Sequence, residues 1–256
     1  MEDKKNYDLP IFIINLPECS ERRQSMLAEF SKYNVPVHFF EGKNGKILTE
    51  KEILELVNLD KVQKNYNRPL SKGEIGCSIS HLKLYKKMID ENIMHAIILE
   101  DDVKINDNFL DVYSDLSKLA PKNYIIKTDT SVRNGLFSLF GCKNLKKTTL
   151  KKPVFDVFFA RGYYIDIIAA KKVLDQYDKI ECVADDWTRL GKKSKLRLCF
   201  PYFVEDNEET PSFIGEERFE VSKEQASNKK NSIISRLLKN PGFFTRRLKR
   251  LLLPLN

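Results

Sequence analysis

The chain has 256 residues, of which 42% are hydrophobic and 31% charged, a balance typical of a globular protein rather than a disordered or membrane-spanning one. Its five cysteines form no Cys-x-x-Cys pair, and only three histidines occur. A disulfide framework or a zinc site is therefore not expected, and a reducing cytosol fits best.

The net charge of +8 belongs to one end of the chain. Residues 229–256 hold eight of the 44 basic residues and none of the 36 acidic ones, so the rest of the chain is electrically balanced. A nucleic-acid groove would need a basic stripe. We therefore expect no nucleic-acid partner for the body of the protein.

The N-terminal residues show no targeting pattern. They include acids, and the apolar run that follows them, 11–16, is only six residues long. A signal peptide needs a longer apolar stretch, and a membrane-spanning helix needs about 20 residues. The expectation is a cytoplasmic protein.

Strands and helices are predicted to alternate over the first 200 residues. In chain order, hydrophobic spacing gives a strand at 10–16, a helix at 21–33, a strand at 35–40, a helix opening at Thr49 with Glu52 completing a capping box, an amphipathic helix at 79–92, strands at 95–99, 124–128 and 154–165, a helix at 167–177 and a strand at 197–204. Residues 205–217 are acidic and predict a loop. The pattern indicates an α/β fold with a mostly parallel sheet, whose ligands bind beyond the carboxyl ends of the strands.

Three adjacent acids, Glu100, Asp101 and Asp102, follow the apolar run 95–99. Three unpaired carboxylates cannot stay inside a buried strand, so the cluster should emerge at the strand's carboxyl end. An all-oxygen site of this kind suits Mg²⁺ or Mn²⁺ bound to a diphosphate. The alternative is a helix cap with acids that complement the helix dipole. Walker and Rossmann glycine motifs are absent.

Several segments together resemble glycosyltransferase family 25, which includes lipooligosaccharide and collagen galactosyltransferases. The most specific is Gly73 to His81, which looks like the family's Gly-Glu-x-Gly-Cys-x-x-Ser-His signature. The others, in the family's order, are 14–16 with Arg22 and Arg23, 96–102, 162–165 with 170–172, 185–187 and 211–215. The resemblance covers about residues 9–216. The chain differs at Arg161 and Asp166, where many relatives carry His and Ser.

The resemblance implies a glycosyltransferase A-type (Rossmann-like) catalytic domain, assigned here to residues 1–228. It also implies a UDP-sugar donor, most often UDP-galactose, and inversion at the anomeric carbon. For a bacterial source the acceptor would be a lipid-linked saccharide of the lipooligosaccharide or lipopolysaccharide core.

Roles can be assigned on this basis. Glu100 and Asp102 are predicted to bind Mn²⁺ or Mg²⁺. Asp185 or Asp186 is predicted to be the general base, with a helix cap before Trp187 as the equal alternative. The residues expected around the donor are Asn15, Leu16, Arg22, Gly73, Glu74, Ser80, His81 and Asp101.

Alternatives exist for three of these donor-pocket residues. A lone histidine such as His81 is commonly structural. Glu74 could brace its loop instead of contacting the donor sugar. Of Arg22 and Arg23, which both suit phosphate by their fork geometry, at least one should be an ordinary surface arginine. Gly73 and Gly76 are expected to permit close backbone approach or positive φ.

Residues 229–256 form a basic tail with two apolar stripes, one containing Ile233 and Leu237 and the other Phe244 and Leu248, separated by Pro241 and Gly242. Short basic amphipathic helices of this kind lie in the plane of an anionic membrane surface. We therefore expect peripheral binding to the cytoplasmic face of the inner membrane. A helix packed on the domain, a partner-protein helix and a nucleic-acid tail are the alternatives.

Two rival functions use the same features. A catalytically inactive relative could bind saccharides at the membrane, and a metal-dependent phosphotransferase could use the acidic triplet. Release of a nucleoside diphosphate from a UDP-sugar separates a glycosyltransferase from the phosphotransferase. The presence of all the acids Glu100, Asp101, Asp102, Asp185 and Asp186 speaks against the inactive relative.

Overall fold

The computed structural model of the chain describes residues 9–128, 143–151, 160–194, 197–199 and 204–206. The predicted tail at 229–256, the loop beyond 206 and the first half of the predicted strand at 154–165 lie outside these residues. Among the described residues, no helix is both long and apolar enough to cross a membrane.

A six-stranded mixed sheet organises the fold, in the order β2-β1-β3-β8-β5-β9. The strands are β1 (Ile11–Asn15), β2 (Val37–Glu41), β3 (His95–Glu100), β5 (Tyr124–Lys127), β8 (Gly162–Asp166) and β9 (Arg197–Cys199). Strand β8 runs antiparallel to both of its neighbours, and the other pairings are parallel. The predicted α/β fold with a mostly parallel sheet is confirmed, with one reversed strand at its centre.

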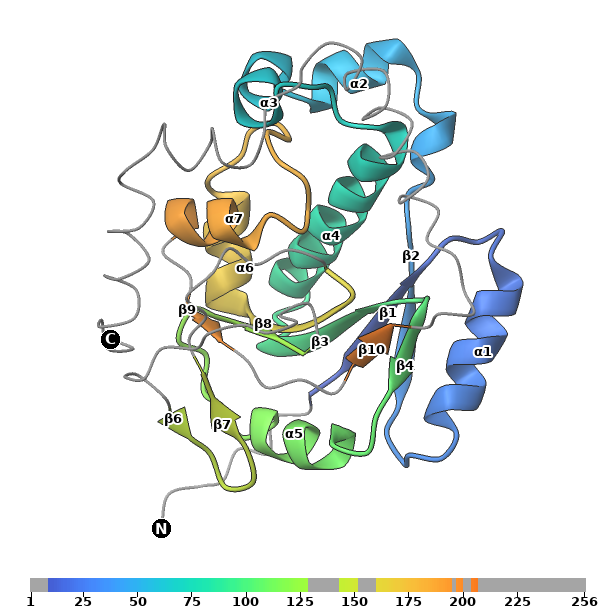
Figure 1. Cartoon of the computed structure of the whole chain (residues 1–256), viewed down its shortest axis with the longest axis vertical. Helices are drawn as coiled ribbons and strands as arrows, with labels where there is room; N and C mark the ends of the chain where they lie inside the picture. The colour runs from blue at the N-terminus through green and yellow to red at the C-terminus, as the bar shows by residue number, and fades with distance from the viewer. Residues whose placement is uncertain (1–8, 129–142, 152–159, 195–196, 200–203, 207–256) are drawn as a thin grey trace, which may run out of the picture.

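Helices cover both faces of this sheet (Figure 1). They are α1 (Ser20–Phe30), η1 (Gly45–Ile47), α2 (Glu50–Leu56), α3 (Leu59–Tyr66), α4 (Lys72–Asp90), α5 (Phe109–Leu116), α6 (Ile167–Leu174) and α7 (Trp187–Ser194). Two small ribbons complete the described elements: β4 (Val103–Ile105) with β10 (Val204–Asp206), and β6 (Lys143–Asn144) with β7 (Thr149–Leu150).

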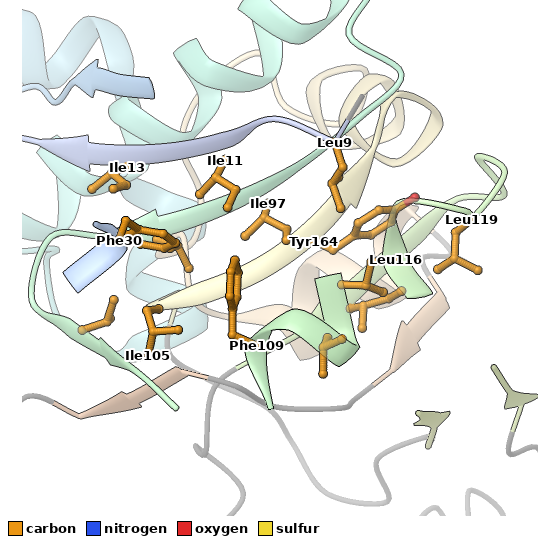
Figure 2. Packing of buried hydrophobic residues seen from close by; sticks show 14 of the residues in the cluster. Leu9, Ile11, Ile13, Phe30, Ile97, Ile105, Phe109, Leu116, Leu119 and Tyr164 are labelled. Atoms are coloured by element: carbon orange, nitrogen blue, oxygen red, sulfur yellow. The ribbon is translucent and has the colours of Figure 1, made fainter. Parts of the chain in front are cut away.

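The sheet carries one core layer on each face because successive strand residues point to opposite faces, and a third buried cluster lies where α2, α3 and α4 meet. Ile97 and Leu99 pack with α1 and α5 through residues such as Phe30 and Phe109, as Figure 2 shows for part of that layer. Ile98 belongs to the opposite layer, with α4, α6 and Trp187. Both faces of β3 are therefore buried, which explains its continuous apolar run.

The structure differs from the expectations at several points. Helix α4 begins at Lys72, well before the predicted residue 79, because Ser71 and Glu74 form a capping box. The predicted strand at 197–204 is two strands in separate sheets. The loop predicted at 205–217 begins within β10, which pairs with β4. Helices α3 and α5 were not predicted.

Candidate functional site

A pocket of about 380 Å³ opens at the carboxyl ends of β1 and β3. Strand β2 pairs with one edge of β1, and β3 pairs with its other edge, so the strand order reverses direction at β1. Such a switch in strand order leaves a crevice where α/β proteins bind ligands. The lining residues are Ile14, Leu16, Glu18, Cys19, Arg22, Lys43, Asn44, Gly45, Lys46, Gly73, Cys77, Ser80, His81, Glu100, Asp101 and Asp102.

Eight of the twelve predicted site residues therefore meet in one place. They come from β1, α1, α4 and the end of β3, and they are Leu16, Arg22, Gly73, Ser80, His81, Glu100, Asp101 and Asp102. The four that do not line this pocket are Asn15, Glu74, Asp185 and Asp186.

Asp101 anchors the arginine of this pocket. One of its oxygens accepts a hydrogen bond from the Asn15 side chain at 2.6 Å, and the other accepts from Arg22 at 2.9 Å. Asn15 also donates to the carbonyl of Cys19 at the start of α1. Asn15 thus positions Asp101, and through it Arg22, from behind the pocket wall.

Asp102 has the chemistry of a metal ligand. Its Oδ2 lies 3.7 Å from Arg22, while its buried Oδ1 has no hydrogen-bond partner among the described residues. Burial first, and then the charge of Glu100, raises the pKa of Asp102 to about 7 against the opposing effect of Arg22. A buried oxygen without a partner beside a second carboxylate fits a hard cation, with Asp102 and Glu100 as the holding residues.

Glu100 faces helix α4. Its Oε1 lies 3.8 Å from His81 Nε2 and 3.8 Å from Cys77 Sγ. Burial alone would raise the pKa of Glu100, but His81 and Arg161 outweigh this and hold the pKa below its usual value. Glu100 is therefore held in its charged, metal-binding form.

The start of α4 shapes the pocket through its backbone. A Cβ on Gly76 would lie 2.5 Å from the carbonyl oxygen of Lys43 and 2.6 Å from the nitrogen of Gly45. Ser80 accepts a hydrogen bond from the nitrogen of Lys43 at 2.8 Å. The absence of a Cβ at Gly76 therefore lets the 43–46 loop pack against the backbone of α4. This close approach is one of the two expected uses of the signature glycines.

Glu74 braces the segment just before α4 and does not line the pocket. Its carboxylate accepts two hydrogen bonds from Arg68, both at 2.7 Å, and one from the nitrogen of Ser71 at 2.9 Å. The Glu74 side chain is fully buried. These contacts fit the structural alternative, and the contact of Glu74 with the donor stays a prediction.

The acidic pair before α7 also lies away from this pocket. The two oxygens of Asp186 accept hydrogen bonds from the Arg189 nitrogen at 3.0 Å and from Tyr66 at 2.8 Å, and Arg189 Nε lies 3.1 Å away. The helix-cap alternative therefore describes Asp186. Asp185 is buried beside it and stays a predicted base.

Two further positions clarify the differences from the family pattern. Arg161 lies at the site's edge of the sheet, where its carbonyl accepts from the nitrogen of Glu100. Asp166 lies at the opposite edge, paired with His95, and caps α6 through Ala169. Asp166 therefore has a structural role at the start of α6.

Sequence reasoning missed part of the pocket wall. The sequence-based prediction gave no site role to Lys43, Asn44 or Lys46, and it included Cys77 only as part of the signature. The available signal was the pair of glycines at 42 and 45 directly after β2, since the carboxyl ends of β1 and β2 meet at one edge of the sheet.

Comparison with known proteins decides the family. Residues 8–188 match the family model described as glycosyltransferase family 25 (LPS biosynthesis protein). The chain belongs to glycosyltransferase family 25. The earlier resemblance is thus confirmed.

Relatives of this family 25 protein occur in animals and bacteria. Procollagen galactosyltransferase 2 of Homo sapiens is 34% identical over 110 residues, which cover 42% of this chain and 17% of that protein. A putative glycosyltransferase of Haemophilus influenzae is 33% identical over 97 residues, covering 38% and 33%. The chain thus spans a minor part of the length of both.

Among solved structures, a glycosyltransferase involved in the glycosylation of the major capsid of PBCV-1 is similar at 9% identity, with a TM-score of 0.36. The match covers 84% of this chain and 98% of that one.

Proposed function

We propose that this protein is an inverting, GT-A-type galactosyltransferase that uses UDP-galactose and a saccharide of the lipooligosaccharide or lipopolysaccharide core. The observation that carries the proposal is the set of Arg22, Glu100 and Asp102 converging in one pocket at the strand-order switch. The family description supports the lipopolysaccharide acceptor, and the named animal relative supports galactose.

The pocket residues divide the work between charge and position. Arg22, held by Asp101, offers its fork to a diphosphate. Glu100 and Asp102 would hold Mn²⁺ or Mg²⁺, which neutralises the charge of the departing diphosphate when bound. Leu16 and Ile14 supply apolar contact at the end of β1.

The transfer itself needs a base on the acceptor side. The acceptor oxygen bonds to the anomeric carbon as the bond to UDP breaks, and a carboxylate takes the hydroxyl proton. Asp185 is our proposed base, since Asp186 caps α7. Full turnover in Asp185→Asn would remove it from this role.

The location and assembly follow as part of the proposal. The catalytic domain comprises residues 1–228, and the basic tail at 229–256 holds it peripherally on the cytoplasmic face of the inner membrane, close to a lipid-linked acceptor. UDP-sugar, acceptor and anionic lipid are the partners.

The first test is a thermal-shift screen with and without Mn²⁺ against UDP, UDP-galactose, UDP-glucose, UDP-N-acetylhexosamines, GDP-mannose and CMP-sialic acid. We expect stabilisation by uridine nucleotides that depends on Mn²⁺, strongest for UDP-galactose among the sugars, and release of UDP from it. A folded protein that responds to no uridine nucleotide would contradict the proposal and favour an inactive relative.

A further inference from the structure

A second set of possible metal ligands lies beside the carboxylate pair of Glu100 and Asp102, called here the oxygen-only pair. Cys77 and His81 are one turn apart on α4 and so share a face, and Glu100 ends the neighbouring strand β3. Cys77 Sγ, one ring nitrogen of His81 and one oxygen of Glu100 all lie within 4.8 Å of one another. We propose that these three side chains bind a thiophilic divalent cation such as Zn²⁺.

The spacing fits tetrahedral zinc. Bonds of about 2.3 Å to sulfur and about 2.0 Å to nitrogen or oxygen place ligand atoms about 3.3–3.6 Å apart at tetrahedral angles. Glu100 Oε1 is 3.8 Å from both His81 Nε2 and Cys77 Sγ. The two pairs that include Glu100 need to close by only a few tenths of an ångström, and the Cys77 and His81 atoms, which lie within 4.8 Å of each other, can approach further by side-chain rotation.

Buried tyrosines fix the orientation of the His81 ring. Its Nδ1 lies 2.6 Å from the Tyr163 hydroxyl, which lies 2.7 Å from the Tyr85 hydroxyl, and both tyrosines are buried. An outer partner of this kind sets the orientation and tautomer of a metal-binding histidine. In the zinc-bound form Nδ1–H would donate to Tyr163, which leaves the lone pair of Nε2 for the metal, whereas in the metal-free form Nε2–H can face the carboxylate of Glu100.

His81 Nε2 also needs a partner. The side chain is 2% exposed, and Nε2 has no hydrogen-bond partner among the described residues. A buried polar nitrogen rarely stays unpaired, because the desolvation cost is then uncompensated. A metal ion at the pocket wall satisfies it.

The site differs in chemistry from the oxygen-only pair. Sulfur and imidazole ligands select zinc, whereas Glu100 with Asp102 suits magnesium or manganese. Three protein ligands leave a fourth zinc position open toward the pocket. Because Glu100 belongs to both sites, zinc would compete with Mn²⁺ for this carboxylate. This competition rests on the proposed function, whereas zinc binding itself does not.

The sequence alone predicts no zinc site, because it has no Cys-x-x-Cys pair and only three histidines. That rule covers ligands close together in sequence. Here two ligands come from one helix turn and the third from a strand 19 residues further along, so only the fold brings them together.

The test uses the full chain, with a phosphine reductant and no added nucleotide. Zinc binding is followed by titration calorimetry, and Co²⁺ serves as the spectroscopic probe because thiolate ligation gives a charge-transfer band. We expect one equivalent of Zn²⁺ and a thiolate–Co²⁺ band in the wild type. Cys77→Ser should lose the band and bind Zn²⁺ at least about tenfold more weakly, a change of about 1.4 kcal/mol.

Matched variants identify the ligands. Cys19→Ser, at another cysteine of the pocket, should keep the band, and Asp102→Asn should keep zinc binding while losing the stabilisation by Mn²⁺. Zn²⁺ should also slow alkylation of Cys77 in the wild type, a readout that needs no variant to fold. Absence of the band in the wild type, or its persistence in Cys77→Ser, overturns the zinc site without touching the nucleotide proposal.

Discussion

The acidic triplet divides its work residue by residue. Both carboxylate oxygens of Asp101 accept hydrogen bonds, one from Asn15 and one from Arg22. In contrast, one oxygen of Asp102 has no hydrogen-bond partner among the described residues. The sequence predicts that carboxylates gather here because three charges cannot stay in a buried strand. It cannot predict which oxygen is occupied, since the donor Asn15 lies 86 residues away.

Asp102 should make metal-free stability fall with pH. Its pKa is raised, by burial first, to about 7 in the folded state, so between about pH 4 and pH 7 the folded protein holds a proton that the unfolded chain has lost. The free energy of unfolding therefore drops as pH rises, by at most about 4 kcal/mol. Asp102→Asn should remove this slope in denaturant melts run in a chelator. Parallel pH profiles for wild type and variant would contradict the shift.

Arg22 and Arg23 provide a matched pair for donor binding. Arg22 lines the pocket on Asp101, whereas Arg23 is exposed and stacks on Phe39 at 4.0 Å. Arg22→Ala should weaken UDP binding by about tenfold or more, since a charge-assisted phosphate contact is lost. Arg23→Ala should change it by less than about twofold. Calorimetric titration with UDP and Mn²⁺ measures both, and equal losses would mean that neither contact is specific.

At the scale of elements, the α4 signature is both a helix start and a pocket wall. Ser71 and Glu74 cap the helix, and Gly76 lets the 43–46 loop approach its backbone. The resemblance marks this stretch as functional, but local spacing misses its helicity because two glycines interrupt the apolar pattern. Capping and tertiary contact overcome that weak propensity.

Two glycines in helices test the close approach. Gly76→Ala would push a Cβ into the backbone of Lys43 and Gly45, so it should lower the free energy of unfolding by about 1–3 kcal/mol and weaken UDP binding. Gly191→Ala in α7 meets nothing within 4 Å and should stabilise by up to about 1 kcal/mol, through helix propensity alone. Denaturant melts compare the two. A Gly76→Ala variant as stable as the wild type would show that the loop is not held against α4.

At the scale of the whole molecule, the apolar runs at β1, β3 and β5 were enough to predict the class of fold. Their order, and the reversal of β8, depend on pairings between distant segments such as Ile98 with Tyr163. The pocket could be foreseen as an edge of the sheet, because parallel strands end together. The wall contributed by α4 was predicted only through the resemblance and not from local spacing, since its position depends on the contact of α4 with the 43–46 segment.

At the same scale, the basic tail should serve membrane binding alone, and the body of the protein should bind the nucleotide without it. Residues 229–256 carry eight of the 44 basic residues and two apolar stripes. Each cation near an anionic leaflet contributes about 1 kcal/mol, and salt screens that attraction. Deleting 229–256 should abolish binding to phosphatidylglycerol-containing liposomes while UDP-dependent thermal stabilisation persists.

A charge-matched variant distinguishes the two contributions. Replacing Phe244, Leu248 and Leu251 with Ser keeps every basic residue of the tail. If apolar insertion anchors the protein, this variant should bind only at low salt, whereas the wild type should retain binding at physiological salt. Co-sedimentation at two salt concentrations measures the difference. Liposome binding by the truncated chain would instead place the membrane contact on residues 1–228, where basic and acidic residues are equal in number.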